Sequence, residues 1–294
     1  GQTVLTDANG YYRFDGLAAG TYAVQITPDN WTGLSGNLPQ GTTAGASIAA
    51  TGRPLAGYQS STVGTNGVTG VTTGTGSTNN NDKGINPVGT YAAAGVKSGN
   101  VVLGPNNQPS ADNDTAVGTN GGPGPTGDAY DNLTVDFGFF RLSVGDTVWR
   151  DDGAGTAANY NNGIRDTGEP ALANVTLELR KGGTVVAVTT TDANGFYVFT
   201  QQTNAAGVGN GEPLAPGADY TITIPANQTA LAGLKSSAAP ATQPTVNNVG
   251  TSTLDDGDKG TGTAATTSVT SSAAFTLDVS STGAAANGNN TYGR

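Results

Sequence analysis

The chain has 294 residues, of which 46 are Gly and none is Cys, Met or His, and its net charge is -10 with only 12% of residues charged. Without Cys and His it has no disulfide, thiol nucleophile, zinc finger or Ser-His-Asp triad. The 12 Lys and Arg residues are scattered among 22 acidic ones, so they cannot form the basic face that binds nucleic acid. No apolar run reaches the roughly 20 residues of a membrane-spanning helix, and we expect no membrane insertion. A chain without Cys or Met has no easily oxidised side chain, which suits an extracellular protein.

Three short blocks of sequence occur twice, in the same order. The copies lie at residues 6–14 and 191–199, at 17–20 and 214–217, and at 81–84 and 257–260. The first block begins with Thr-Asp-Ala-Asn-Gly in both copies. The spacing of roughly 180 residues has the size of a domain and is too long for a solenoid repeat. The sequence therefore predicts two tandem domains, residues 1–141 and 142–294.

Apolar residues alternate with polar ones over several short runs. Examples are Val135–Phe139, Val175–Leu179 and Tyr220–Ile224. A period of two, bounded by Asn-Gly and Pro-Gly turns, is typical of half-buried antiparallel strands. We therefore expect an all-β protein with two β-sandwiches. The Gly-, Thr- and Asn-rich stretches 33–82 and 226–253 lack this period, which predicts surface excursions with short strands of their own, or disorder.

The join between the two predicted domains contains no Gly/Ser- or Pro-rich spacer. The residues from Asp136 to Arg141 continue through Leu142 and Ser143 directly into Val144–Trp149. A join without flexible residues restricts independent motion of the domains. The sequence therefore predicts a stiff rod.

Several of these motifs together resemble the SdrD B-like (serine-aspartate-repeat protein B-like) domains of bacterial surface adhesins. The motifs are Val144–Trp149, Asn162–Pro170, Val175–Leu179, Thr191–Gly195 and Val135–Phe139. The resemblance implies two tandem prealbumin-like (transthyretin-like, Ig-like) β-sandwiches, calcium binding in the loops, secretion, and service as a stalk or fibre module. Related collagen-adhesin B-type modules carry a Lys–Asn isopeptide bond that starts from a Lys in the opening strand. The strand Val144–Trp149 contains no Lys, so we expect no such cross-link.

The resemblance also implies a calcium site in residues 151–169. The family's loop is similar to an EF-hand loop without its helices, with ligands at positions one, three, five, seven, nine and twelve. The corresponding residues are Asp151 or Asp152, Asn162, Ile164 through its backbone carbonyl, Asp166 and Glu169. An insertion at 153–160 leaves the first and third ligands open, with Asn159 and Asn161 as substitutes. The alternative is a loop that holds itself together by Asx turns, without metal.

Two further acidic clusters are candidate metal sites. One joins Asp82 with Asp112 and Asp114, and Asp128 and Asp131 are further candidates; the other contains Asp255, Asp256 and Asp258. Like charges so close in sequence repel one another, and either a divalent cation or plain solvation relieves that repulsion. Because hard cations prefer such oxygen ligands, the expected cofactor is Ca²⁺.

Each predicted sandwich is incomplete at one chain end. The first starts at a segment that matches 182–185, so it has no counterpart of residues 144–181, and the second ends before a counterpart of Val135–Phe139. A neighbour that supplies the absent strand would bury the open edge. The expected partners are copies of the chain, joined head to tail by strand complementation, or further repeats of a longer chain. Sequons at Asn30, Asn113, Asn132, Asn174, Asn227 and Asn289 offer sites for surface glycans.

The leading functional hypothesis is a structural, calcium-stabilised module of a secreted bacterial surface protein, located outside the cell or on its surface. The alternative is an adhesin module in which Trp31, Tyr58, Tyr91 or Tyr160 binds carbohydrate or another host ligand. A glycoside hydrolase with paired carboxylates is disfavoured because the acidic residues cluster in runs, as metal ligands do. We expect no enzymatic activity.

Overall fold

A computed structural model of the chain describes residues 1–32, 53–61, 83–105, 132, 135–217, 219–237, 270–272 and 274–277. The chain forms two compact units. Unit 1 contains Gly1–Pro28 and Gln59–Phe140, and unit 2 contains Asp29–Tyr58 and Arg141–Arg294. Short antiparallel strands dominate the described residues, and the helices among them are single turns. No helix in this part of the chain is long and apolar enough to cross a membrane.

Unit 1 is built from short strands around a small core. Its elements are β1 (Gly20–Tyr22), β2 (Gln25–Ile26), β3 (Gln59–Ser60), β4 (Gly84–Ile85), α2 (Tyr91–Ala94), β5 (Val96–Ser98), β6 (Val101–Leu103) and β7 (Phe139–Phe140). β1 pairs with β6, β5 lies between β2 and β4, and β3 pairs with β7. Val96 and Val101 are buried, and so is the ring of Tyr91. A 3-10 turn, η1 (Pro28–Asn30), follows β2.

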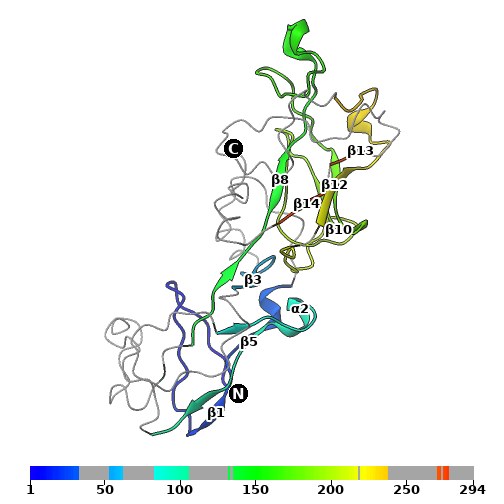
Figure 1. Cartoon of the computed structure of the whole chain (residues 1–294). Helices are drawn as coiled ribbons and strands as arrows, with labels where there is room; N and C mark the ends of the chain where they lie inside the picture. The colour runs from blue at the N-terminus through cyan, green and yellow to red at the C-terminus, as the bar shows by residue number, and fades with distance from the viewer. Residues whose placement is uncertain are drawn as a thin grey trace. The chain divides into compact units, whose positions relative to one another are not determined.

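Unit 2 contains the larger sheet (Figure 1). Its elements are β8 (Val144–Thr147), η2 (Gly153–Gly155), η3 (Ala157–Asn159), β9 (Thr176–Lys181), β10 (Thr184–Thr190), β11 (Phe196–Phe199), β12 (Asp219–Ile224), η4 (Thr229–Leu231), β13 (Thr270–Ser271) and β14 (Phe275–Thr276). The strand order in the large sheet is β10-β9-β12-β13, and β14 also pairs with β12. β8 and β11 form a second, separate ladder.

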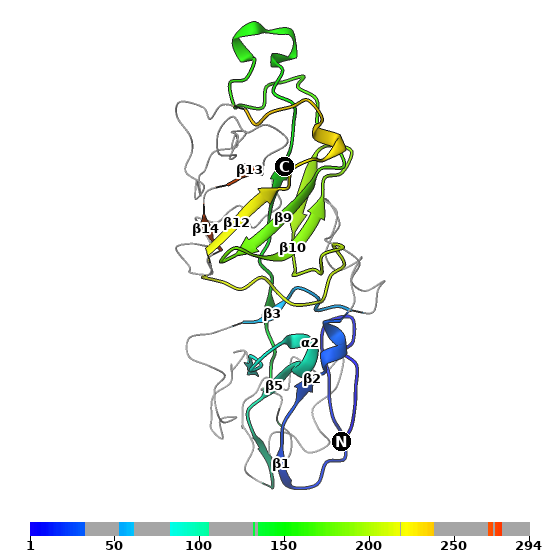
Figure 2. The ribbon, with the colours of Figure 1, turned by 90° about the vertical axis from the view of Figure 1, so that its right-hand side faces the viewer.

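The core of unit 2 follows the alternation expected for β9. Val175, Leu177 and Leu179 are at most 1% exposed, while the residues between them stay partly exposed. Phe196 and Val198 of β11 are buried as well. Figure 2 shows β9, β10 and β12 side by side as one sheet. Burial of one face of each strand is the pattern of a β-sandwich.

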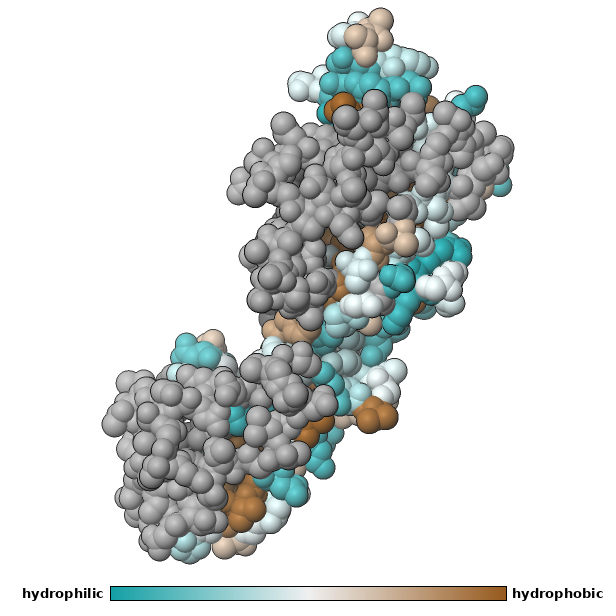
Figure 3. Space-filling model, in the orientation of Figure 1, coloured by the Kyte–Doolittle hydropathy of each residue, from teal (hydrophilic) through white to brown (hydrophobic). Residues whose placement is uncertain are grey.

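On the face shown in Figure 3, the described residues are mainly hydrophilic, with hydrophobic side chains in small patches.

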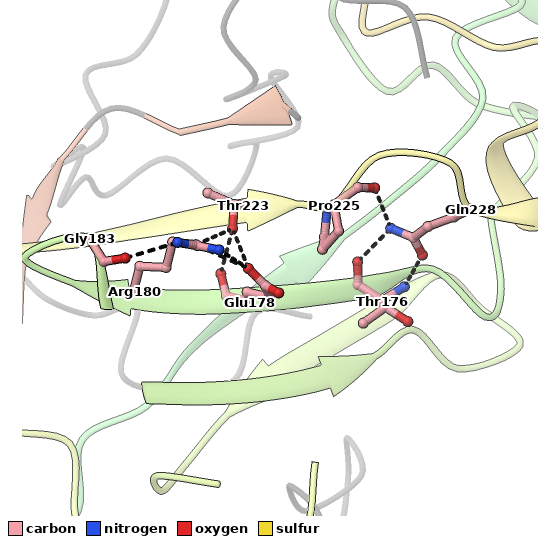
Figure 4. A network of polar contacts seen from close by, with 7 residues as sticks. All are labelled: Thr176, Glu178, Arg180, Gly183, Thr223, Pro225 and Gln228. Atoms are coloured by element: carbon pink, nitrogen blue, oxygen red, sulfur yellow. Dashed lines mark hydrogen bonds and ion pairs between the residues drawn. The ribbon is translucent and has the colours of Figure 1, made fainter. Parts of the chain in front are cut away.

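The outer face of the sheet carries a polar network that changes the expected burial of β12. Arg180 bonds the Glu178 carboxylate at 2.6 Å and the Thr223 hydroxyl at 3.2 Å (Figure 4). Thr223 is only 5% exposed, although the alternation places it on the polar side of β12. The Thr176 N–H donates to the Gln228 side chain at 2.6 Å, and the Gln228 side chain donates to the Thr176 carbonyl at 2.9 Å. The side chain thus takes the place of a neighbouring strand. Thr223 is therefore buried among polar partners, although the alternation of apolar and polar residues in β12 predicted that it faces solvent.

The repeated Thr-Asp-Ala-Asn-Gly motif forms the same turn in both units. The Asp7 carboxylate accepts from the N–H groups of Asn9 and Tyr11, at 2.8 and 3.0 Å. Asp192 accepts from the residues two and four positions later at 2.8 and 2.9 Å. Asn204 makes the same pair of bonds at 2.9 and 3.0 Å, in a third copy of the turn. Its sequence is Thr-Asn-Ala-Ala-Gly, with Asn in place of the Asp of the other two copies.

A tyrosine after the Leu-Ala-x-Gly block also recurs in both units. The Tyr22 hydroxyl donates to the Ala18 carbonyl at 2.6 Å. The Tyr220 hydroxyl donates to the Ala215 carbonyl at 3.1 Å and accepts from the Ala215 N–H at 2.9 Å. A tyrosine that ties a strand to the preceding loop is a known feature of β-sandwiches. The sequence repeat is thus also a repeat of local structure.

The described part of Asp29–Tyr58 packs within unit 2. Trp31 is fully buried, and its indole N–H donates to the Tyr58 carbonyl at 2.7 Å. The Gly57 N–H donates to the Gly211 carbonyl at 2.8 Å. Gly211 has φ 86, and a side chain there would collide with the Trp31 carbonyl. The segment Asp29–Tyr58 therefore contributes a core residue to unit 2, although the rest of unit 2 begins only at Arg141.

Candidate metal centre

The candidate loop, residues 151–169, is closed at its base by backbone hydrogen bonds. The Arg150 N–H donates to the Pro170 carbonyl at 2.8 Å, and the Leu172 N–H donates to the Val148 carbonyl at 2.9 Å. Trp149 and Ala171 form an antiparallel bridge between these bonds. The extension of β8 therefore brings the two ends of the loop together, so residues that are distant in sequence can share one site.

Asp151 connects the start of the loop to its centre. Its carboxylate accepts from the N–H groups of Asn162 and Gly163, at 3.3 and 2.7 Å. Gly163 has φ 74, a conformation that favours Gly and lets the chain turn toward Asp151. The Asn162 side chain accepts from the Ile164 N–H at 2.7 Å and donates to Asp166 at 2.9 Å. Four of the predicted ligand residues are thus joined in one network.

Glu169 connects the end of the loop to its start. One oxygen of its carboxylate accepts from the Gly153 N–H and the other from the Asp166 N–H, both at 2.9 Å. Glu169 is only 6% exposed. A buried carboxylate needs hydrogen bonds or a cation to offset its lost hydration, and here two backbone donors contact it. Asp151, Asn162, Asp166 and Glu169 are therefore linked mainly through backbone N–H groups, with a direct side-chain bond between Asn162 and Asp166. Their side-chain oxygens are of the kind that Ca²⁺ prefers.

Asp152 has a different role from its neighbour. Its carboxylate forms an ion pair with Arg150, at 2.5 Å, and accepts from the Ala154 N–H at 3.2 Å. The hydrogen bond from Arg150, followed by the bond from Ala154, holds the pKa of Asp152 below its ordinary value of 3.8. Ala154, with φ 45, and Asn161, with φ 53, are in the left-handed region that non-Gly residues rarely adopt. The ion pair with Arg150 separates Asp152 from Asp151, and the position of Arg150 directly before the two acids is the signal in the sequence for this difference.

The remaining metal predictions fall on a part of the chain that the structure does not describe. Asp82, Asp112, Asp114, Asp128, Asp131, Asp255, Asp256 and Asp258 lie outside the described residues. Within the described residues, no three Asp or Glu side chains lie close enough together to hold a metal ion. In the candidate loop, backbone N–H groups contact the carboxylates; the backbone N–H of Asn162 donates to Asp151, and the side-chain amide of Asn162 donates to Asp166.

Two of the four aromatic residues in the carbohydrate-binding hypothesis are buried. Trp31 is fully buried and Tyr91 is 8% exposed, so neither ring can stack on a sugar, and the hypothesis was wrong for both. The ring of Tyr58 is covered by the Arg141 guanidinium, 5.1 Å from its centre. Tyr160 is 66% exposed, at an open hollow lined also by Asp152, Gly155, Thr156 and Ala157. The rings of Trp31 and Tyr91 occupy core positions, which a local sequence pattern does not reveal.

Comparisons with known proteins agree with this architecture. The SdrD B-like domain family matches residues 142–282. The chain is 28% identical over 226 residues, 75% of its length, to serine-aspartate repeat-containing protein F of Staphylococcus epidermidis. It is 28% identical over 253 residues, 69% of its length, to serine-aspartate repeat-containing protein D of Staphylococcus aureus.

A shorter segment is more similar to a third relative. Over 73 residues, 24% of the chain, it is 41% identical to serine-aspartate repeat-containing protein I of Staphylococcus saprophyticus. The chain spans 9%, 18% and 4% of the lengths of proteins F, D and I. No solved structure matches it significantly. Residues 142–282 therefore match the SdrD B-like domain family, and the chain is homologous to the staphylococcal serine-aspartate repeat proteins.

Proposed function

We propose that the protein is a calcium-stabilised structural module of a secreted bacterial surface protein, which serves in a stalk or an extracellular filament and has no enzymatic activity. The observation that carries this proposal is the network of Asp151, Asn162, Asp166 and Glu169 in one closed loop. Calcium binding is known for SdrD B domains, which supports the same assignment. The homology to serine-aspartate repeat proteins supports a location at the cell surface.

The calcium ligands are the side-chain oxygens of Asp151, Asn162, Asp166 and Glu169, with the Ile164 backbone carbonyl as a further ligand. Asp151 is the first ligand because Arg150 already neutralises Asp152. A bound Ca²⁺ supplies two positive charges among three carboxylates, so it opposes their repulsion and holds the loop closed. The acidic clusters around Asp82 and Asp256 are candidates for further sites.

A calcium titration of the full chain tests this assignment. We expect Ca²⁺ to raise the melting temperature, since a ligand at 100 times its Kd adds about 2.7 kcal/mol to the free energy of unfolding. Glu169→Gln removes a ligand charge and should lower the binding stoichiometry measured by calorimetry by one ion. Asp152→Asn is the matched control, because this acid is next to the first ligand and is paired with Arg150. Equal stoichiometry for the parent chain and Glu169→Gln would exclude this loop.

Head-to-tail assembly by strand complementation is the proposed arrangement in the filament. Residues 1–14 of unit 1 match β10 and β11 of unit 2, which pair with β9 and β8. The described residues 1–14 form no strand ladder, and Leu5 is 91% exposed. A segment that lies outside any strand ladder and has exposed apolar side chains can accept a strand from a neighbouring copy or from a further repeat of a longer chain.

The calcium-loaded and chelated samples also test the assembly. We expect negative-stain electron microscopy to show chains of copies, and these should shorten when Leu5 is replaced by Asp. Monodisperse single copies in both samples would rule out assembly between separate chains and leave the longer covalent array. The sequons, including the exposed Asn174, remain proposed glycan sites.

A further inference from the structure

The outermost strand of the large sheet, β10, has the properties of a sheet edge that attracts other strands. It lies at the end of the strand order, beyond β9 (Figure 2). Its sequence, Thr-Val-Val-Ala-Val-Thr-Thr, has high β-propensity and contains neither a charge nor a Pro. Uncharged edge strands of this length present free backbone groups and commonly pair with other chains unless something covers them.

The outer edge of β10 is covered at its centre by Thr203. The Thr203 N–H donates to the Val186 carbonyl at 3.0 Å. The Val188 N–H donates to the Thr203 hydroxyl at 2.6 Å, and that hydroxyl lies 3.5 Å from the Val188 carbonyl. Thr203 thus satisfies the Val186 carbonyl and the Val188 N–H, which a neighbouring strand would otherwise use.

The Asn204 turn holds Thr203 in this position. The Asn204 N–H donates to the Val208 carbonyl at 2.9 Å, and the Asn204 side chain accepts from Ala206 and Val208 at 2.9 and 3.0 Å. The neighbouring Gln202 donates from its backbone to the Glu212 carbonyl at 2.8 Å. The cover therefore has its own local hydrogen bonds and lies along the strand as a preformed unit.

This segment is an insertion relative to unit 1. Between Phe199 and Leu214 lie 14 residues, whereas between the matching Phe14 and Leu17 lie only two, a difference of 12. The shorter connection is sufficient to join the same two repeat blocks in unit 1. The additional residues in unit 2 are therefore not needed to connect the blocks, and they lie against the one long uncharged edge.

We propose that residues 202–210, the edge guard, block self-association through β10, and that β10 of a second copy is the strand that pairs there when the guard is displaced. Two copies of β10 can pair in antiparallel orientation about a two-fold axis, because the strand carries no charges that would repel each other. This lateral contact differs from the head-to-tail assembly proposed above, which uses unit 1.

Point substitutions in the full chain test the guard without removing Gly211, which contacts Trp31. Thr203→Val deletes the hydroxyl that caps the Val188 N–H, and Asn204→Ala deletes the acceptor that forms the turn. Asn204→Asp is the matched control, because Asp7 and Asp192 form the same turn with a carboxylate. Val188→Lys, combined with Thr203→Val, places a charge on the edge, opposite Glu178 in the strand register.

The measurements are amide hydrogen exchange at position 188 and sedimentation velocity, each relative to the parent chain. We expect Thr203→Val and Asn204→Ala to raise the exchange rate about tenfold and to add a concentration-dependent dimer. Asn204→Asp should match the parent chain. In the double variant Thr203→Val/Val188→Lys, the amide at position 188 should exchange fast, but the sedimentation coefficient should equal that of the parent chain.

Three results would overturn the proposal. They are an unchanged exchange rate in Thr203→Val, fast exchange without association, and association that the lysine does not reverse. The comparison is always with the parent chain, so a failure of head-to-tail assembly leaves this test intact.

Discussion

At the scale of single residues, adjacent side chains of one type have different environments. Asp151 accepts from two backbone N–H groups at the centre of the candidate loop, whereas Asp152 pairs with Arg150. The same principle applies to tyrosines. Tyr160 is 66% exposed, while burial raises the pKa of Tyr197 well above its ordinary value of 10.0, and the negative charge of Asp146, its cross-strand partner, raises it further.

The raised pKa of Tyr197 predicts how stability changes at high pH. Near neutral pH the hydroxyl is protonated in both the folded and the unfolded chain, so it adds no pH dependence. Above pH 10 the unfolded chain loses this proton and the folded chain keeps it, so the free energy of unfolding falls by about 1.4 kcal/mol per pH unit. Tyr197→Phe should reduce this slope in urea unfolding measured between about pH 9 and about pH 11.

The exposed Tyr160 provides the control for this measurement. Tyr160→Phe removes the same hydroxyl from a ring in solvent and should leave the slope as in the parent chain. Burial also raises the pKa of Tyr220, so Tyr197→Phe should reduce the slope without abolishing it. Identical slopes for the parent chain and Tyr197→Phe would contradict a raised pKa of Tyr197 in the folded chain.

At the scale of elements, one turn recurs at Asp7, Asp192 and Asn204. In each copy a side-chain oxygen accepts two backbone N–H groups, and the following Gly has φ between 74 and 86. A polar side chain that bonds its own backbone in this way sets a turn without help from the rest of the fold. The same turn therefore connects β10 to β11 at Asp192, recurs at Asp7 in unit 1, and holds the edge guard at Asn204.

Substitution of Asp192 measures the contribution of this turn to stability. Asp192→Ala leaves the N–H groups of Asn194 and Phe196 without their acceptor and should lower the free energy of unfolding by about 1–2 kcal/mol. Asp192→Asn keeps an acceptor, as Asn204 does naturally, and should stay within about 0.5 kcal/mol of the parent chain. Urea unfolding measures both, and equal midpoints for the Ala and Asn variants would show that the acceptor is unimportant.

At the scale of the whole molecule, the compact units do not follow the order of the sequence. The segment Asp29–Tyr58 belongs to unit 2, so the chain passes between the units three times, at residues 28–29, 58–59 and 140–141. Within unit 2, Trp31 is fully buried and is fixed by the Tyr58 carbonyl. The stability of unit 2 therefore depends on a residue more than a hundred positions before the segment that matches the SdrD B-like family.

Replacement of Trp31 tests this dependence. Trp31→Ala should lower the free energy of unfolding by about 3–5 kcal/mol, because it removes a large buried ring and leaves a cavity. Hydrogen exchange should increase at Gly57 and at Gln202, whose N–H groups bond carbonyls of the segment at 211–212. Val102→Ala, at a side chain that is 46% exposed in unit 1, is the control and should change exchange at neither position. Unchanged exchange in Trp31→Ala would mean that the ring does not support unit 2.

Much of the local structure could be predicted from sequence alone, since it depends on neighbours along the chain. The period of two in Val175–Leu179 predicted which side chains of β9 are buried, and the Asp192 turn follows from residues within four positions. The four residues Asp151, Asn162, Asp166 and Glu169 were named as candidates for one site by the resemblance to the family's loop. The Asn204 turn could be predicted in the same way, because Asn replaces Asp as the acceptor of the two backbone N–H groups.

The tertiary structure decided what depends on contacts between distant segments. It buried Trp31 and Tyr91, which the sequence offered as carbohydrate-binding residues, and it buried Thr223 beside Arg180 against its period. It also placed Thr203 over the edge of β10. Composition and period determined that this protein is made of short strands and acidic turns. The partner of each buried polar group comes from elsewhere in the chain, and only the fold brings it within hydrogen-bonding distance.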